Sequence, residues 1–245
     1  WQLHTLRQWD QLSSSRVDYL LANSNFTAKR IWKYWRRHSE VLHPPVDVSR
    51  FEWNKPREDF YLSVCRLVPN KRVDLVVRAF NRLKLPLIVI GDGAEKAYLK
   101  NLAGPTVQIL GFQSKEKIEK LMSRCRAFVY AGIEDFGIAP VEAMASGAPV
   151  IAFGRGGVLD TVKCFNSNTE KGATGLLFPA QTTKSLVEAI EFFNEKQLWR
   201  DLKPELIRDW SHSFSQESFK NRFAKTINRA WSEHMNSCDI ATSDL

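Results

Sequence analysis

Residues 60–83 read FYLSVCRLVPNKRVDLVVRAFNRL. The short apolar run Phe60–Val64 predicts a buried strand, and apolar residues at helical spacing over Arg72–Leu83 predict an amphipathic helix. The loop between them carries Arg66 and Lys71, five residues apart and directly after the strand. The stretch therefore predicts the strand, loop and helix that open a βαβ unit.

The same alternation of strands and helices continues toward the C-terminus. It predicts an α/β fold, in which a Rossmann-like parallel sheet is flanked by helices. Because ligands bind beyond the carboxyl ends of parallel strands, the glycine-bearing loops at that edge are the expected binding face. Strands are predicted at Leu87–Ile90, Thr106–Leu110, Ala127–Tyr130, Pro149–Phe153 and Gly175–Phe178. Helices are predicted at Ala94–Leu102, Lys115–Ser123 with Ser114 as its N-cap, Ala139–Ala145 and Thr182–Phe193.

Residues on the N-terminal side of this domain indicate a second one. Residues 1–40 are expected to be the end of an N-terminal domain, also Rossmann-like, with a strand at Val17–Ala22 and a helix at Phe26–Arg36. Because its first residue is Trp1, the chain is expected to be a fragment that lacks most of this domain. Residues 41–57 are expected to be an interdomain linker, since the pair Pro44-Pro45 opposes helix and sheet bonding.

The Rossmann-like domain is expected to span residues 58–210, and residues 211–245 to follow it as a helix and a tail. Within that segment a helix is predicted over Phe214–Met235. Four large apolar side chains recur along it at a spacing of four, so it is expected to pack back on the N-terminal unit. These side chains are Phe219, Phe223, Ile227 and Trp231.

Composition excludes several classes of protein. The chain has 245 residues, 44% of them hydrophobic, and no apolar run long enough to span a membrane. Its net charge of +8 suits anionic partners, but no nucleic-acid-binding motif is present. The four cysteines are widely spaced, which argues against a zinc site or a disulfide framework and favours a reducing cytoplasm.

The densest basic stretch is residues 29–37, KRIWKYWRR, in which cations alternate with aromatic residues. One interpretation is a solvated amphipathic helix whose aromatic side chains face a core. The other is contact with an anionic membrane surface or a lipid-linked acceptor. The sequence leaves both open.

Residues 132–147, GIEDFGIAPVEAMASG, carry the densest set of functional groups. Glu134 is predicted in a loop, and Glu142, eight residues later, one to two turns into the following helix. Between them Phe136, Gly137 and Ile138 present backbone N–H groups at a helix start, which attracts phosphate or sugar hydroxyls. The loop Gly154–Gly157 offers more backbone to a ligand, and Arg66 and Lys71 offer positive charge to a diphosphate.

Together these stretches resemble glycosyltransferase family 4, within the two-domain GT-B fold. The similarity runs in family order over nearly the whole chain, and its most specific element is the pair of glutamates around the FGI centre. The matching pieces are SNFTAKRI, HPPVDVSRF, CRLVPNKRVDLVVRAF, IGDG, GF, EDFGIAPVEAMASGAPVIA and TGLLF. Cys65 departs from the pattern, because Gly or Ser is more usual before the arginine.

The resemblance implies a role for each site residue. Arg66 and Lys71 would bind the diphosphate and stabilise it as the leaving group. Glu134 would lie at the transferred sugar, where it is expected to act in catalysis with Arg66 and Lys71, and Glu142 would hydrogen-bond the nucleotide ribose. The other residues expected to bind the donor are Phe136, Gly137, Ile138, Gly156 and Gly157.

The implied activity is transfer of a hexosyl group, with mannosyl favoured, from a GDP- or UDP-linked sugar to a glycan or lipid-linked acceptor. The resemblance implies retention of anomeric configuration and no metal or other cofactor, and it is strongest to members that build lipopolysaccharide or exopolysaccharide. The fragment alone is expected to be inactive. The expected location is the cytoplasm, with peripheral contact at the inner face of the membrane. Alternatives are a nucleotide-sugar binding module without catalysis, or another GT-B enzyme such as an epimerase.

Overall fold

The computed structural model describes residues 1–165 and 172–243, with side chains described as far as residue 236. The chain divides into two compact units. The larger spans residues 46–215, and the smaller combines residues 1–45 with residues 216–245.

The larger unit contains a six-stranded sheet in which every pair of neighbours is parallel. The strand order is β5-β4-β3-β6-β7-β8, so the predicted α/β fold with a Rossmann-like parallel sheet is confirmed. All six strands were predicted, three of them to the residue. They are β3 Tyr61–Val64, β4 Leu87–Ile90, β5 Val107–Gly111, β6 Ala127–Tyr130, β7 Val150–Phe153 and β8 Gly175–Phe178.

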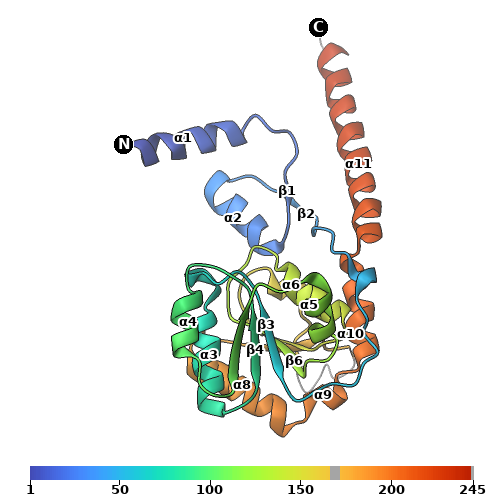
Figure 1. Ribbon diagram of the computed structural model, residues 1–245. Coiled ribbons are helices and arrows are strands. Elements are labelled where there is room, and N and C mark those ends of the chain that lie inside the picture. The colour runs from blue at the N-terminus through green and yellow to red at the C-terminus, as the bar shows by residue number, and fades with distance from the viewer. Residues whose placement is uncertain (166–171, 244–245) are drawn as a thin grey trace. The chain divides into compact units, whose positions relative to one another are not determined.

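Helices cover both faces of this sheet (Figure 1). One group joins α3 to α4 and α8, and another joins α6 to α7 and α10. Ser114 caps α5 as predicted, since its Oγ accepts a hydrogen bond from the Lys117 N–H at 3.3 Å. The helices of this unit are α3 Val73–Leu83, α4 Lys96–Leu102, α5 Lys115–Met122, α6 Ile138–Ala145, α7 Val158–Thr161, α8 Thr183–Glu195, α9 Leu198–Asp201 and α10 Pro204–Ser211. Short 3₁₀ turns are η1 Val48–Arg50, η2 Pro69–Lys71 and η3 His212–Phe214.

A single hydrophobic core lies between the sheet and these helices. All residues of the central strand β6 are buried, as expected for a parallel strand covered on both faces. The largest side chains of the core are aromatic and come from both strands and helices. They include Tyr61, Phe80, Phe128, Phe178 and Phe193.

The segment expected to be a linker belongs mostly to the larger unit. The backbone N–H of Val46 donates to the Phe214 carbonyl at 2.8 Å. Val48 and Phe51 are buried in the core. The compact unit therefore begins at Val46 rather than at residue 58. Burial of these apolar side chains in the core removes them from water, which stabilises the segment against an extended and exposed conformation.

The smaller unit is built from β1 Leu21–Ala22, β2 Glu40–Val41 and three helices. The two strands pair in parallel, but β1 is shorter than the predicted Val17–Ala22. The reason is Arg37, whose guanidinium donates to the carbonyls of Val17 and Asp18 and so removes them from sheet bonding. The helices are α1 Gln2–Ser14, which was not predicted, α2 Asn25–Trp35 and α11 Gln216–Ser243.

Helix α11 differs from its prediction in the side chains it buries. Phe223, Ile227 and Trp231, members of the predicted apolar stripe, are exposed. Among the α11 side chains that the structure describes, the buried one is Thr226, whose hydroxyl donates to Glu40 of β2 at 3.1 Å. Polar contacts therefore attach α11 to its own unit. The helix also continues through Ser243, into the predicted tail, of which residues 244–245 lie outside the described residues.

Helix α2 carries the basic and aromatic stretch. None of its residues is fully buried, and Trp32 and Tyr34 are 46% and 59% exposed. Ser24 caps the helix by accepting from the Thr27 N–H at 3.1 Å. The interpretation that its aromatic side chains face a core is not met by Trp32 and Tyr34. Among the described residues, no helix is both long and apolar enough to cross a membrane.

Candidate functional site

The strand order reverses direction between β3 and β6, the two central strands of the sheet. From β3 the chain moves outward through β4 to β5, and from β6 it moves the other way through β7 to β8. In open parallel sheets such a switch point leaves a crevice at the carboxyl ends of the strands, where ligands bind. The loop 65–71 follows β3 and the loop 131–137 follows β6. The residues predicted from these two loops therefore lie at the switch point.

Lys71 and Glu134 are in direct contact across this point. The Lys71 ammonium forms an ion pair with Oε1 of Glu134, with side chains 15% and 31% exposed. Burial lowers the pKa of Lys71, while the neighbouring Cys65 and Asp135 oppose that shift. The site thus brings a partly shielded cation against one of its two predicted acids.

Tyr130, at the end of β6, completes this contact and was not predicted. Its hydroxyl donates to the same Glu134 oxygen that Lys71 binds. Because the ring is buried, the position of the hydroxyl is fixed, and Oε1 of Glu134 is bound by both the tyrosine and the lysine. Burial also raises the pKa of Tyr130 well above its ordinary value, so it stays a hydrogen-bond donor at neutral pH. The only sequence signal was a tyrosine in an otherwise apolar strand, four residues before Glu134.

Arg66 is exposed, and its side chain forms no hydrogen bond or ion pair within the described part of the chain, although its backbone carbonyl accepts from the Val68 N–H at 3.0 Å. Its loop is supported from behind by the β4–α4 turn. The Leu67 N–H donates to the Asp92 carbonyl at 2.9 Å. A Cβ at Gly91 would lie 1.8 Å from the Cys65 carbonyl oxygen, so only glycine allows this approach.

Cys65, the departure from the family pattern, lies beside this cationic loop. Burial raises the pKa of its thiol to about 12, and Lys71 acts in the opposite direction. The thiol is therefore neutral at physiological pH, and the cation of Lys71 is not cancelled by a thiolate.

The three residues at the start of α6 contribute differently from one another. Gly137 is the N-cap, with a φ of 92° that favours glycine. Ile138 is exposed, whereas Phe136 is buried against Phe214, with ring centroids 5.7 Å apart. The Phe136 side chain therefore faces the core, and only its backbone can line a ligand site as predicted.

Gly156 and Gly157 support the Glu134 loop. The Gly157 N–H donates to the Glu134 carbonyl at 2.8 Å. A Cβ at Gly157 would lie 2.3 Å from the Asp135 carbonyl oxygen, and one at Gly156 would lie 2.5 Å from that of Glu134. The two backbones are in contact, so these glycines, predicted as ligand contacts, hold the loop that carries the carboxylate.

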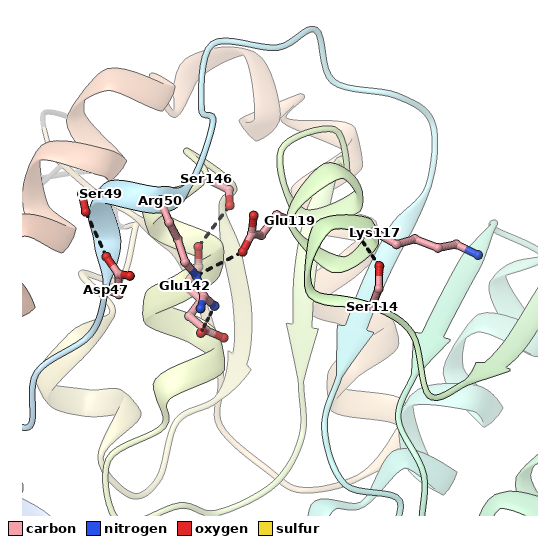
Figure 2. Close-up of polar contacts among 8 residues, drawn as sticks. All are labelled: Asp47, Ser49, Arg50, Ser114, Lys117, Glu119, Glu142 and Ser146. Atoms are coloured by element: carbon pink, nitrogen blue, oxygen red, sulfur yellow. Dashed lines mark hydrogen bonds and ion pairs between the residues drawn. The ribbon is translucent and has the colours of Figure 1, made fainter.

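Glu142, on α6, is held by a residue from outside the predicted set. Arg50 places Nη2 2.7 Å from Oε1 of Glu142 and Nε 3.2 Å from Oε1 of Glu119 on α5. Figure 2 shows the Arg50 side chain between the two helices, with one carboxylate on each side. Burial raises the pKa of Glu142, and Glu119 adds to this shift, while Arg50 and Lys115 oppose it. The sequence does not indicate a role for Arg50, because it lies within residues 41–57, where a linker is expected.

Three cysteines of the described residues, Cys65, Cys125 and Cys164, are free thiols. The side chain of Cys238 lies outside the described residues. Within the described residues, no group of three or more His, Cys, Asp or Glu side chains is placed to hold a metal ion.

Several curated relatives are named as mannosyltransferases. The chain is 26% identical to the alpha-1,3/1,6-mannosyltransferase ALG2 of Candida glabrata, over 90% of this chain and 61% of that protein. It is 28% identical to ALG2 of Saccharomyces cerevisiae, over 70% of this chain and 45% of that protein. A GDP-mannose-dependent alpha-mannosyltransferase of Mycobacterium tuberculosis is 31% identical over 54% of this chain and 33% of that protein. The chain thus spans about half the length of the curated relatives it matches.

Solved structures share the fold. Anabaena HepE, solved with UDP and glucose, superposes with a TM-score of 0.72 at 21% identity, covering 86% of this chain and 63% of that one. A sucrose-phosphate synthase of Thermosynechococcus elongatus gives a TM-score of 0.76 at 20% identity, covering 94% and 62% of the two chains. The family model described as "Glycosyl transferases group 1" matches residues 46–211, nearly the whole larger unit. The chain belongs to the group 1 glycosyl transferases.

Proposed function

We propose that the larger unit binds a nucleotide-diphosphate sugar at the β3–β6 switch point and presents it as the donor for glycosyl transfer. The observation that carries this proposal is the contact between Lys71 and Glu134, which joins the loops after the two central strands. Arg66 lies exposed on the same loop as Lys71. A cation pair beside a carboxylate suits a ligand that combines a diphosphate with sugar hydroxyls.

In this proposal each charged group has one task. Arg66 and Lys71 bind the diphosphate oxygens, and because negative charge builds up there as the sugar leaves, they stabilise the transition state more than the bound donor. Glu134 accepts hydrogen bonds from the sugar and stabilises its developing positive charge. Glu142 accepts hydrogen bonds from the ribose hydroxyls. These two cations supply the charge that a metal ion supplies in other phosphate chemistry, so donor binding needs no metal.

The transferred group is a hexose, and mannose is favoured because curated relatives are mannosyltransferases. The acceptor class is a glycan or a lipid-linked glycan, and transfer proceeds with retention of anomeric configuration. A donor-binding module without catalysis is the competing function. Kinetics of the Glu134 variant distinguish the two, because a mere binding residue leaves kcat unchanged.

The experiment is calorimetric titration of the 245-residue chain with GDP, UDP, ADP and their sugar conjugates, with EDTA present. One nucleoside diphosphate should bind clearly better than the others. Arg66→Ala and Lys71→Ala should each raise its Kd by roughly ten- to a hundredfold, the value of one charge-assisted hydrogen bond. Arg82→Ala, which removes an exposed arginine on α3, is the control and should leave the Kd unchanged. Wild-type Kd values in both site variants would contradict the proposal.

We also propose that α2 contacts an anionic membrane surface. It exposes Trp32 and Tyr34 among basic side chains, and such a surface suits the interface of anionic lipids, which favours each nearby cation by about 1 kcal/mol. Glutamine at Lys29, Arg30 and Lys33 should abolish flotation with phosphatidylserine vesicles. Glutamine at Lys115, Lys117 and Lys120 of α5 removes the same charge and should not. If both variants lost flotation equally, net charge alone would explain vesicle binding, and the assignment of the membrane contact to α2 would be wrong.

A further inference from the structure

Arg50 is the one side chain that joins α5 to Glu142 in the described part of the site. It comes from η1, before the first strand of the sheet, and reaches over Phe51, whose ring lies 4.6 Å from the guanidinium carbon. The guanidinium of Arg50 contacts two carboxylates, with Nη2 toward Glu142 and Nε toward Glu119 (Figure 2). Three segments distant in sequence therefore meet at one guanidinium.

We infer that Arg50 is a positioning residue for donor recognition, which holds Glu142 in the orientation and charge state that accept the ribose hydroxyls. This inference rests on the proposed function, in which Glu142 binds the ribose. It goes further because it assigns the preference for ribose to an arginine outside the two ligand loops.

Geometry supports this role. Arg50 occupies only Oε1 of Glu142, at 2.7 Å, so the remaining lone pairs of the carboxylate stay available to two neighbouring hydroxyls. Without Arg50, Glu142 would lose the contact that fixes its rotamer. Lysine can replace arginine only in part, because it keeps the charge but its single ammonium lacks the planar fork that contacts two carboxylates in fixed directions.

Electrostatics support the same role. Glu142 is largely buried, and burial together with Glu119 favours its neutral form. Arg50 and Lys115 are the cations that oppose this shift. A neutral Glu142 carries a hydroxyl donor and accepts more weakly, so loss of Arg50 would weaken ribose binding even if the side chain did not move.

The test compares a nucleoside diphosphate with its 2′-deoxy form in the same protein. Calorimetry first identifies the tightest of GDP, UDP and ADP, and the ratio of deoxy to ribo Kd is then measured. The wild-type chain should prefer the ribonucleotide. Arg50→Met should reduce this preference about tenfold, the value of a charge-assisted hydrogen bond. Because both ligands meet the same folded fraction, partial unfolding of a variant cancels from the ratio.

Matched variants make the result specific. Arg124→Met removes an arginine of similar exposure, 38% against 33%, which pairs with Glu58, and should keep the wild-type ratio. Arg50→Met combined with Glu142→Gln should lose no more preference than Glu142→Gln alone, since Arg50 acts through Glu142. Arg50→Lys should give an intermediate ratio, and serves if the methionine variant does not fold.

The possible failures are distinct. A wild-type chain that binds no nucleotide contradicts the proposed function itself. If Glu142→Gln keeps the ribose preference, the role of Glu142 is wrong and the inference is overturned with it. If Glu142→Gln loses the preference but Arg50→Met keeps it, only the role of Arg50 is overturned.

Discussion

The two glutamates of the site are eight residues apart, yet each is held by a different kind of partner. Glu134 lies in a loop and pairs with Lys71, which is itself a proposed ligand of the diphosphate. Glu142 lies on α6 and pairs with Arg50, which is not a proposed ligand. In the proposed function the diphosphate therefore competes with Glu134 for Lys71, while the Arg50 contact can persist. The first pair is a contact to be exchanged, and the second is a support.

The largest effect expected from this difference is on catalysis. Glu134→Ala should lower kcat for transfer by on the order of 10², the loss typical of one preorganised electrostatic group, with a smaller effect on donor Kd. Glu142→Ala should mainly raise the donor Kd. Steady-state kinetics with the true donor and acceptor measure both. If Glu134→Ala raised KM and left kcat intact, both glutamates would be binding residues and the contrast would disappear.

Nucleotide binding without the sugar should show opposite signs for the two glutamates. Glu142→Gln should raise the Kd about tenfold by weakening the ribose contact. Glu134→Gln should lower the Kd by up to about fivefold, because Lys71 no longer has to leave a partly exposed ion pair. Calorimetry on both variants checks this, and weaker binding in both would mean that Lys71 keeps Glu134 when the diphosphate binds.

The pH dependence of binding should depend on the second pair. Burial and Glu119 raise the pKa of Glu142 above its ordinary 4.5, so as the pH falls this carboxylate takes up its proton earlier than a free glutamate. As the pH is lowered, nucleotide affinity should therefore begin to decline before the pH reaches 4.5. Glu142→Gln should remove the part of this decline that comes from protonation of Glu142.

The same shift has the opposite sign for folding. A raised carboxyl pKa contributes stability that is present below 4.5 and is lost as the pH rises through the folded pKa. Titration of Glu142 is tested by the pH profiles of nucleotide affinity. Identical profiles for the wild-type chain and Glu142→Gln would show that Glu142 does not titrate over the pH range in which affinity declines.

The smallest effect is expected from the hydroxyl behind the first pair. Tyr130→Phe removes the hydrogen bond to Glu134 and should cost about 1 kcal/mol of stability, or ~2–4 °C in Tm for a domain of this size. Thermal unfolding measures this loss. Val129→Ala, a core change on the same strand whose side chain points to the opposite face of the sheet, is the stability control. If only Tyr130→Phe also lowered kcat, Tyr130 would orient Glu134 for transfer.

Most of the larger unit could be predicted from the sequence, because local signals and tertiary structure agree there. Strands β4, β6 and β8 follow apolar runs that end at glycine or turn residues, and their bounds match the predictions. The smaller unit could not be predicted as well. α1 exposes apolar side chains such as Leu6 and Trp9, so it lacks the buried face that makes a helix recognisable in sequence. β1 is shortened by Arg37, which is distant in sequence from the carbonyls it binds.

The candidate site shows the same division. Arg66, Lys71 and Glu134 follow strands, and the rule that ligands bind at the carboxyl edge of a parallel sheet predicts that they come together. Arg50 precedes the sheet and reaches Glu142 only after the chain has folded, so no spacing in the sequence indicates the contact. Phe136 lies within the motif, yet its side chain serves the core. Motif spacing identifies positions, but only packing decides which of them face a ligand.

The contact between Gly157 and the Glu134 loop limits how this protein can be altered by laboratory evolution. Any side chain at residue 157 would overlap the backbone at Asp135 and Phe136, whatever its polarity. Randomising residue 157 in a library for new donor preference would be unproductive, since most variants would disrupt the structure of the Glu134 loop rather than change its ligand contacts. Exposed neighbours such as Ile138 and Arg155 have room for new side chains, so altered sugar preference should be sought at those two positions.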